Sequence, residues 1–405
     1  MSSPSDRWLP WYAYLTALAT LGLVCLGGLV TSKGVGMSVP DWPTSFGYNM
    51  FALPVSQWFH GGVFDEHTHR LWASMVGLMV VFLTRWLGGR AARRPLAIIG
   101  ATEIFLGIAL LGLGPDWRGA GHFLAGIGGV VVLAAVVWHQ GEAREAPLPA
   151  LGWLAFWAVQ LQGLLGGLRV VLDQWTLGNV TLGLLLGLVH GCLGQAFLVL
   201  LGVIALRVSP FWSRLVRSGS AQVPHRLAAW VTAGTVLIVL QLILGASMRH
   251  QHSGLAIPDF PTAYGRWWPA LDDAALLRYN QNRIEESTVT AFQIVLQLLH
   301  RLGAVGVLVA VAMACRVGTR CGTLPRVVMR GLRCWLGLIC IQAGLGAATI
   351  WTNKAADVAT AHVAIGALSL LIGTGLILVL RKLSVPVRVR DFRETAAPLA
   401  QPFAR

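Results

Sequence analysis

The sequence predicts an all-α polytopic membrane protein: two pseudo-symmetric four-helix bundles, related as a parallel repeat, plus an inserted helical hairpin. Composition and an internal repeat predict this fold. Of the 405 residues, 55% are hydrophobic and only 12% are charged, which is typical of a chain embedded in lipid. A helix needs roughly 20 apolar residues to cross a bilayer core. Ten stretches meet this need, near 11–31, 67–88, 95–113, 120–138, 150–169, 179–206, 227–248, 288–314, 333–350 and 358–380.

The net charge of +14 is typical of either a nucleic-acid binder or a membrane protein with basic inner loops, and its distribution favours the second. Most Lys and Arg residues fall in alternate short connections between spans, such as those holding Arg93 and Arg214, and in the tail after Arg381. This positive-inside bias predicts cytoplasmic N- and C-termini. We expect anionic membrane lipid as the counter-charge and no nucleic-acid partner. Because ten residues precede the first span, we expect no targeting segment and a bacterial plasma membrane.

An internal repeat organises the chain. Residues 36–47 recur as 254–265, and both copies share the pattern Pro-Asp-aromatic-Pro-Thr between flanking glycines. Each copy follows an outward-running span, the first or the seventh, so the two halves share one orientation in the membrane. The following helix of each half opens with a His-Arg pair, and each half ends on a histidine-bearing helix. These four positions are His69-Arg70, His300-Arg301, His190 and His362.

The two halves differ in length. His69 and His190 are about twice as far apart in the sequence as His300 and His362, and residues 90–148 account for the difference. We interpret 90–148 as a helical hairpin inserted into the first half, because an even number of spans preserves the topology downstream. The predicted domains are then 1–206, with the inserted pair, and 207–405.

The four repeated histidines are the candidate ligands of a cofactor. An ionisable side chain inside a bilayer is expensive and predicts a function, although a single histidine more often bonds two helices together. Paired histidines on facing helices place two imidazoles on opposite sides of a flat ligand, as haem iron requires, whereas zinc wants three or four ligands at one point. We expect His69 with His190, and His300 with His362, to bind haem iron. Other histidines lack a repeat partner of the same type, among them His60, His67, His122, His250 and His252.

Three polar features adjoin these histidines. Arg70 and Arg301 are candidate partners for haem propionates, the alternative being guanidinium groups that reach the interface. The proline-rich loops 36–47 and 254–265 are candidate lids over the pockets, or simple turns. Glu66 lies three residues before His69, on the same helical face, and its counterpart is Gln297.

This difference between Glu66 and Gln297 predicts different acid-base chemistry at the two sites. A carboxylate accepts protons and an amide does not. We therefore assign Glu66 as the candidate catalytic residue. The alternative is a carboxylate that only stabilises the start of its helix.

The stretch Glu66-His67-Thr68-His69-Arg70, with the Pro-Asp-Trp-Pro-Thr loop before it and His190, His300 and His362 after it, resembles the haem A synthase family. The resemblance implies oxidation of a ring methyl of haem O to the formyl group of haem A, for use in terminal cytochrome oxidase. It implies that His69 and His190 flank the substrate haem O, and that His300 and His362 ligate a permanent haem b that passes electrons. Glu66 matches the catalytic carboxylate of the family. Haem O synthase and cytochrome oxidase assembly factors are the expected protein partners.

The chain departs from the family in two ways. The hairpin 90–148 is extra, and it makes His122 a rival of His190 as a ligand. The outer-loop cysteine pair of some members is missing. The alternative function is a bis-histidine membrane cytochrome that only transfers electrons, and the parallel repeat also suggests a transporter, although a transporter needs no paired histidines.

Overall fold

The computed structural model describes residues 7–138, 141–178, 180–217, 221–251, 253–281 and 288–384. The basic tail beyond 384 and His252 lie outside the described residues. The described chain is almost entirely helical. Its long helices are α1 (Leu9–Ser32), α3 (Val63–Gly88), α4 (Arg93–Gly112), α5 (Arg118–Val137), α6 (Leu148–Val171), α7 (Leu182–Val208), α9 (His225–His250), α11 (Ala291–Arg320), α12 (Arg326–Trp351) and α13 (Ala356–Ser384).

Each of the ten predicted spans lies on one of these long helices. By length and hydropathy, the described residues contain nine candidate membrane-spanning segments, because Val63–Gly112 joins α3 and α4 through the short 3-10 helix η3 (Gly89–Ala92). The prediction of an all-α polytopic membrane protein is therefore confirmed.

The short elements lie in the connections and were not predicted. They are the helices α2 (Val55–Trp58), α8 (Pro210–Arg217) and α10 (Asp273–Gln281), the 3-10 helices η2 (Met50–Ala52), η4 (Pro115–Trp117) and η5 (Ser253–Leu255), and the two-stranded hairpins β1 (Thr44–Ser45) with β2 (Tyr48–Asn49) and β3 (Thr176–Leu177) with β4 (Val180–Thr181).

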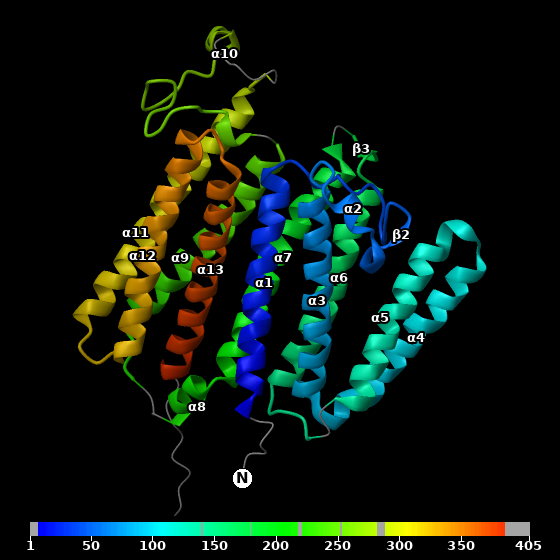
Figure 1. Cartoon of the computed structure of the whole chain (residues 1–405). Helices are drawn as coiled ribbons and strands as arrows, with labels where there is room; N and C mark the ends of the chain where they lie inside the picture. Colours follow the sequence, from blue (N-terminus) through cyan, green and yellow to red (C-terminus); the bar gives the residue numbers. More distant parts are fainter. Residues whose placement is uncertain are drawn as a thin grey trace, which may run out of the picture.

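The long helices pack in two groups. In the first ring, α1, α3, α6 and α7 each contact the next and the last contacts the first; α9, α11, α12 and α13 form the second ring in the same way. The rings meet where α1 and α7 contact α13 and where α7 contacts α9. The loops that follow α1 and α9 lie at one end of the molecule, opposite the N-terminus (Figure 1).

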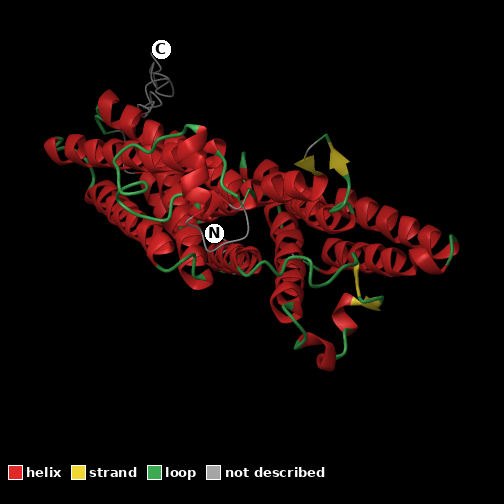
Figure 2. Cartoon of the chain, turned by 90° about the horizontal axis from the view of Figure 1, so that it is seen from above, coloured by secondary structure: helices red, strands yellow, loops and turns green. Residues whose placement is uncertain are grey.

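The pair α4 and α5 stands at the edge of the molecule, beside the first ring (Figures 1 and 2). Glycines let the two helices approach backbone to backbone: a Cβ atom at Gly100 would lie 2.6 Å from the carbonyl oxygen of Gly128, and one at Gly107 would lie 2.7 Å from that of Gly121. Small residues at a seam are the usual means of close helix packing in lipid, where apolar burial gives no driving force between helices.

The chain enters and leaves this helix pair at one place. The amide of Arg144 donates to the carbonyl of Leu87 over 2.9 Å, and the amide of Arg90 donates to that of Gly141 over 2.9 Å. The buried guanidinium of Arg85 donates to the carbonyls of Ala135 and Gly89. Residues 87–90 and 141–144 therefore close the base of the hairpin, which fits an insertion over 90–148.

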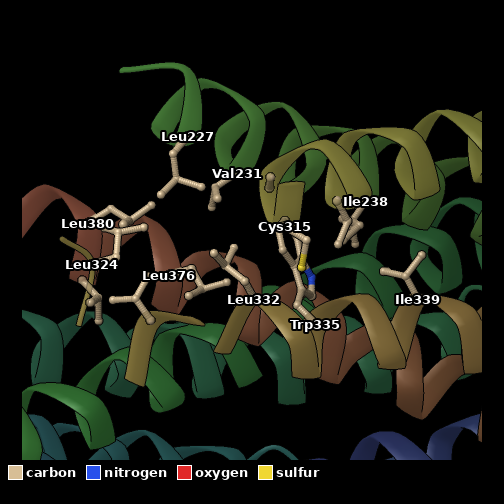
Figure 3. Close-up of a cluster of buried hydrophobic side chains, with 14 of the residues drawn as sticks. Leu227, Val231, Ile238, Cys315, Leu324, Leu332, Trp335, Ile339, Leu376 and Leu380 are labelled. Atoms are coloured by element: carbon tan, nitrogen blue, oxygen red, sulfur yellow. The ribbon is translucent and has the colours of Figure 1, made fainter. Parts of the chain in front are cut away.

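The second ring packs around Trp335, which is fully buried (Figure 3). Its indole N–H donates to the carbonyl of Ser369 over 2.9 Å. Gly234 on α9 and Gly373 on α13 make room for the ring, because a Cβ atom there would lie 3.0 Å and 2.8 Å from indole carbons. Leucine, isoleucine and valine side chains from all four helices of the ring surround it.

We expect Trp335→Ala to destabilise the purified protein by about 3 to 5 kcal/mol, because it opens a cavity in a close-packed core. Thermal unfolding in detergent measures the effect. Trp8→Ala is the matched control, since Trp8 is 67% exposed, and it should leave the unfolding temperature unchanged. Equal shifts for the two variants would contradict the assignment of Trp335 to the core.

Candidate functional site

One large cavity of about 1730 Å³ runs through both rings. This volume exceeds the several hundred Å³ typical of a pocket for one small ligand. All four predicted histidines line it: His69 on α3, His190 on α7, His300 on α11 and His362 on α13. The structure therefore brings the two predicted pairs to a single cavity.

Each histidine ring lies against a glycine of a neighbouring helix. A Cβ atom on that glycine would approach Cε1 of the ring to 3.3 Å or less, so any side chain there would push into the imidazole. The helix that carries the glycine and the helix that carries the histidine are consecutive members of one ring. The pairs are Gly27 with His69, Gly166 with His190, Gly245 with His300, and Gly346 with His362.

Hydrogen bonds between helices do not account for the rings of these histidines, except at Nε2 of His362, which is hydrogen-bonded to Gln342 of α12. Nδ1 of all four is buried, and among the described residues it has no hydrogen-bond partner. Glutamines lie nearby, but Gln162 and Gln241 donate to the main-chain carbonyls of His190 and His300, over 3.2 Å and 2.8 Å, and not to their rings. Gln342 lies 3.4 Å from Nε2 of His362.

The second pair has the spacing of two ligands on one ion. The ring centroids of His300 and His362 are 6.5 Å apart, with their planes inclined by 64°. A nitrogen of each imidazole about 2 Å from a shared metal ion would put the centroids roughly 6 Å apart. The residues present therefore fit a bis-histidine haem. Among the described residues, no group of three or more His, Cys, Asp or Glu side chains forms a metal site.

The first repeated loop is tied to α3 by Glu66 and Arg70. Oε2 of Glu66 accepts the amide of Val39 over 2.9 Å, and Oε1 accepts Nη2 of Arg70 over 2.7 Å. Arg70 also donates to the carbonyls of Val39, Asp41 and Thr44, over 2.8, 2.7 and 3.1 Å. Glu66 is only 4% exposed and lines the cavity. Glu66 therefore lies at the edge of the first site with both carboxylate oxygens bonded, one to the loop and one to Arg70.

The second loop is tied to α11 in the same way by Gln297 and Arg301. Oε1 of Gln297 accepts the amide of Ile257 over 2.6 Å, the position that matches Val39 in the repeat. Arg301 donates to the carbonyls of Asp259 and Thr262 over 2.7 and 2.8 Å. The amide nitrogen of Gln297 donates to carbonyls of the loop, where Glu66 instead accepts a bond from Arg70.

Each loop is closed on itself by its aspartate. Asp41 accepts the amides of Phe46 and Gly47 over 2.6 and 2.8 Å, and Asp259 accepts those of Tyr264 and Gly265 in the same way. Burial raises the pKa of Asp41, but the hydrogen bonds from Gly47, Thr44 and Phe46 outweigh it, so its pKa is lowered. Both loops thus hold an ionised carboxylate and a rigid turn above the cavity.

The sequence did not single out four cations that line the cavity: Arg118, Arg169, Arg249 and Lys354. The ion pairs of the described residues involve other cations, namely Lys33, Arg70 and Arg90. Nη2 of Arg169 would lie 3.0 Å from a Cβ atom at Gly36, and Cδ of Lys354 would lie 3.6 Å from one at Gly254.

Gly36 and Gly254 are matching positions of the repeat, so each loop has one cation beside its first residue. Arg249 of the second ring donates to the hydroxyl of Ser32 on α1 over 2.6 Å and to the carbonyl of Gly28, which links the two rings. The only sequence signal for these cations is their basic charge near the ends of apolar spans.

The rival ligand His122 lies on α5 and also lines the cavity. Its side chain is exposed, and no glycine of a neighbouring helix abuts it. His190 instead repeats the environment of His362, with a glycine against the ring and a glutamine of the preceding long helix beside it. His67 is fully buried away from these pairs, 3.3 Å from the hydroxyl of Ser45 and against Trp58.

The chain is similar to known proteins over most of its length. The chain is 24% identical over 396 residues to a heme A synthase of Geobacillus kaustophilus, covering 95% of this chain and 96% of the relative. It is 25% identical to a heme A synthase of Methylobacterium radiotolerans, covering 89% of this chain and 88% of the relative. A family model described as cytochrome oxidase assembly protein matches residues 121–374. The match includes His190, His300 and His362, and it spans more than half of the sequence. The chain therefore belongs to the COX15-CtaA family of cytochrome oxidase assembly proteins.

Proposed function

We propose that this protein is a haem A synthase, an oxidoreductase that converts haem O to haem A for terminal cytochrome oxidase. Family membership and the names of the relatives support this activity. The structural observation that carries it is the difference between two otherwise matching sites: Glu66 lines the cavity near His69, where Gln297 stands near His300. Pure electron transfer at both sites would need no such difference.

The two rings are proposed as equivalent halves, 1–206 and 207–405. His69 and His190 flank substrate haem O in the first half, and His300 and His362 ligate a permanent haem b in the second. A bis-histidine haem supplies reversible one-electron transfer. We assign Arg169 and Lys354 as cations that face the carboxylates of the bound haems.

Arg70 and Arg301 line the same cavity, but their guanidinium groups are largely committed to loop carbonyls. We propose that their main role is to hold the loops in place. A guanidinium N–H that is not bonded to the loop would donate to a haem propionate. A guanidinium with several fixed acceptors also loses little freedom when a further carboxylate approaches.

Conversion of a methyl to a formyl group removes four electrons, takes one oxygen atom from water and releases four protons. We propose that Glu66 accepts a proton from the attacking water and balances positive charge that develops on the porphyrin edge. The electrons leave to an acceptor outside this chain, and a haem held by His300 and His362 would supply the one-electron transfer for this. Isotope-labelled water should place its oxygen in the formyl group, and incorporation from dioxygen would contradict this route.

The protein is a multi-pass membrane protein, and we propose the bacterial plasma membrane with both termini in the cytoplasm. Its basic residues concentrate at the end opposite the repeated loops. Haem O synthase and cytochrome oxidase assembly factors are the proposed partners, since haem O is poorly soluble in water and passes most simply between membrane proteins. Mass identification of the haems that copurify distinguishes the enzyme from a bis-histidine electron carrier, which would hold haem b alone.

We expect His300→Ala or His362→Ala to abolish the haem b absorption spectrum of the purified protein, because each removes one axial ligand. His122→Ala is the control and should leave bound haem unchanged, since its ring lacks the glycine contact of the four ligands. Loss of a haem signal in His122→Ala would transfer the ligand role from His190 to His122.

We expect Glu66→Gln to keep haem bound and to slow haem A production by about 10² to 10⁴-fold, the usual contribution of a general base. The second half already contains a glutamine at this position beside an arginine four residues on, so the loop should stay in place. Haem A and haem O in membranes of expressing cells measure the effect.

The reciprocal change, Gln297→Glu, is the matched control. It adds a carboxylate to the half that performs no chemistry and should leave haem A production near normal. Normal haem A production in Glu66→Gln would remove Glu66 from the mechanism and restore the electron-carrier function.

A further inference from the structure

The helix pair α4 and α5 enlarges the cavity on the side of the first ring. Gly126, Ile127 and Val130 of α5 line it together with Leu78 of α3 and Gly163 of α6. These residues are apolar and lie at the depth of the membrane-spanning helices. We call the part of the cavity between α5 and the helices α3 and α6 the hairpin chamber.

Contacts at both ends hold α5 away from the first ring without closing the chamber. At the loop end, the rings of Phe123 and Trp42 lie 5.7 Å apart, and a Cβ atom at Gly119 would lie 2.2 Å from the methyl of Thr44. Further along the membrane, Gln160 of α6 donates to Glu103 of α4 over 2.9 Å. Toward the base of the hairpin the space is closed by packed side chains, Val131 of α5 against Val81 of α3 and Phe156 of α6.

The middle of the chamber is open. Nothing lies within 4 Å of a Cβ atom built at Gly126 or at Gly163. The chamber belongs to the same cavity as His69 and His190. The described part of the second ring has no helix pair in the equivalent place. The cavity is thus extended by an additional helix pair beside the first pair of histidines and not beside the second.

We propose that the hairpin chamber binds the long isoprenoid tail of the substrate haem. This inference rests on the proposed function, which assigns haem O to the first half and haem b to the second. Haem O carries such a tail and haem b does not, so the chamber stands beside the site whose ligand needs it. Tail binding would also fix the rotation of the porphyrin about the iron axis and choose which methyl faces Glu66.

Selectivity for a haem with a tail must come from the shape of the hairpin chamber. The tail is as well solvated by lipid as by an apolar pocket, so its transfer into the chamber gains little from the hydrophobic effect. A side chain that fills the chamber should therefore exclude the tail by overpacking. It should not disturb a haem that has no tail.

The experiment compares haem O with haem b on the full-length protein in detergent. Gly126→Leu fills the chamber, and Gly129→Leu is its control, because Gly129 is an equally exposed glycine of α5 that has open space around it but does not line the cavity. Each protein is titrated with haem O or with haem b, and bound haem is extracted and quantified by chromatography. We expect Gly126→Leu to weaken haem O binding tenfold or more and to leave haem b binding unchanged, and Gly129→Leu to alter neither.

Unchanged haem O binding in Gly126→Leu, or an equal loss of both haems, would overturn the chamber as the tail site while leaving the proposed function intact. Failure of the unaltered protein to bind haem O would overturn the proposed function itself. Gly163→Leu approaches the chamber from α6 and should reproduce the selective loss, which separates tail exclusion from a local fault in α5.

Discussion

The contact between each histidine ring and a glycine of the neighbouring helix controls the geometry of the whole site. A glycine lets the backbones approach, and the ring fixes how near they come. Because this contact occurs at each of the four histidines between consecutive helices of one ring, it sets the width of both rings, through which the cavity runs. The buried Nδ1 atoms of these histidines have no partner among the described residues, and an unpaired buried polar atom costs free energy, so the four positions are kept at a cost to stability. Stability and ligand binding are thus coupled at the same four positions.

The repeated loops show how one scaffold holds two different electrostatic environments. Both loops have the same aspartate turn and the same arginine bonds to carbonyls. A single change from glutamine to glutamate then replaces a neutral amide by a buried ion pair, Glu66 with Arg70, at 2.7 Å. A buried charge is tolerated only with a partner and hydrogen bonds; Arg70 of α3 is the partner, and the loop adds the hydrogen bond from the Val39 amide. The loop is therefore a precondition for a carboxylate at this depth.

Sequence alone predicted the ten long helices, because runs of apolar residues of membrane length have few alternatives in lipid. It also predicted the four histidines as two pairs, since two histidine positions each occur in both halves of the repeat, but it did not show that both pairs line one cavity. It could not show that loop carbonyls occupy Arg70 and Arg301, because these bonds join residues about 30 to 40 positions apart through main-chain atoms that carry no sequence signal. Arg118, Arg169, Arg249 and Lys354 were missed for a related reason: they come from α5, α6, α9 and the connection between α12 and α13, and they meet the cavity only through tertiary packing. The glycine contacts were likewise hidden among the 47 glycines of the chain.

The junction at the base of the helix pair α4 and α5 has a consequence for the evolution of the protein. The segments on either side of the pair lie hydrogen-bonded to each other, Leu87 with Arg144 and Arg90 with Gly141. Without the helix pair, a connection would have to bridge only the distance between two neighbouring backbones. A short turn can span that distance. A module of this kind can be gained or lost by one genetic event without reversing any later helix. The same junction is a natural place to graft other paired helices, each of which would give a new lateral wall to an unchanged catalytic centre.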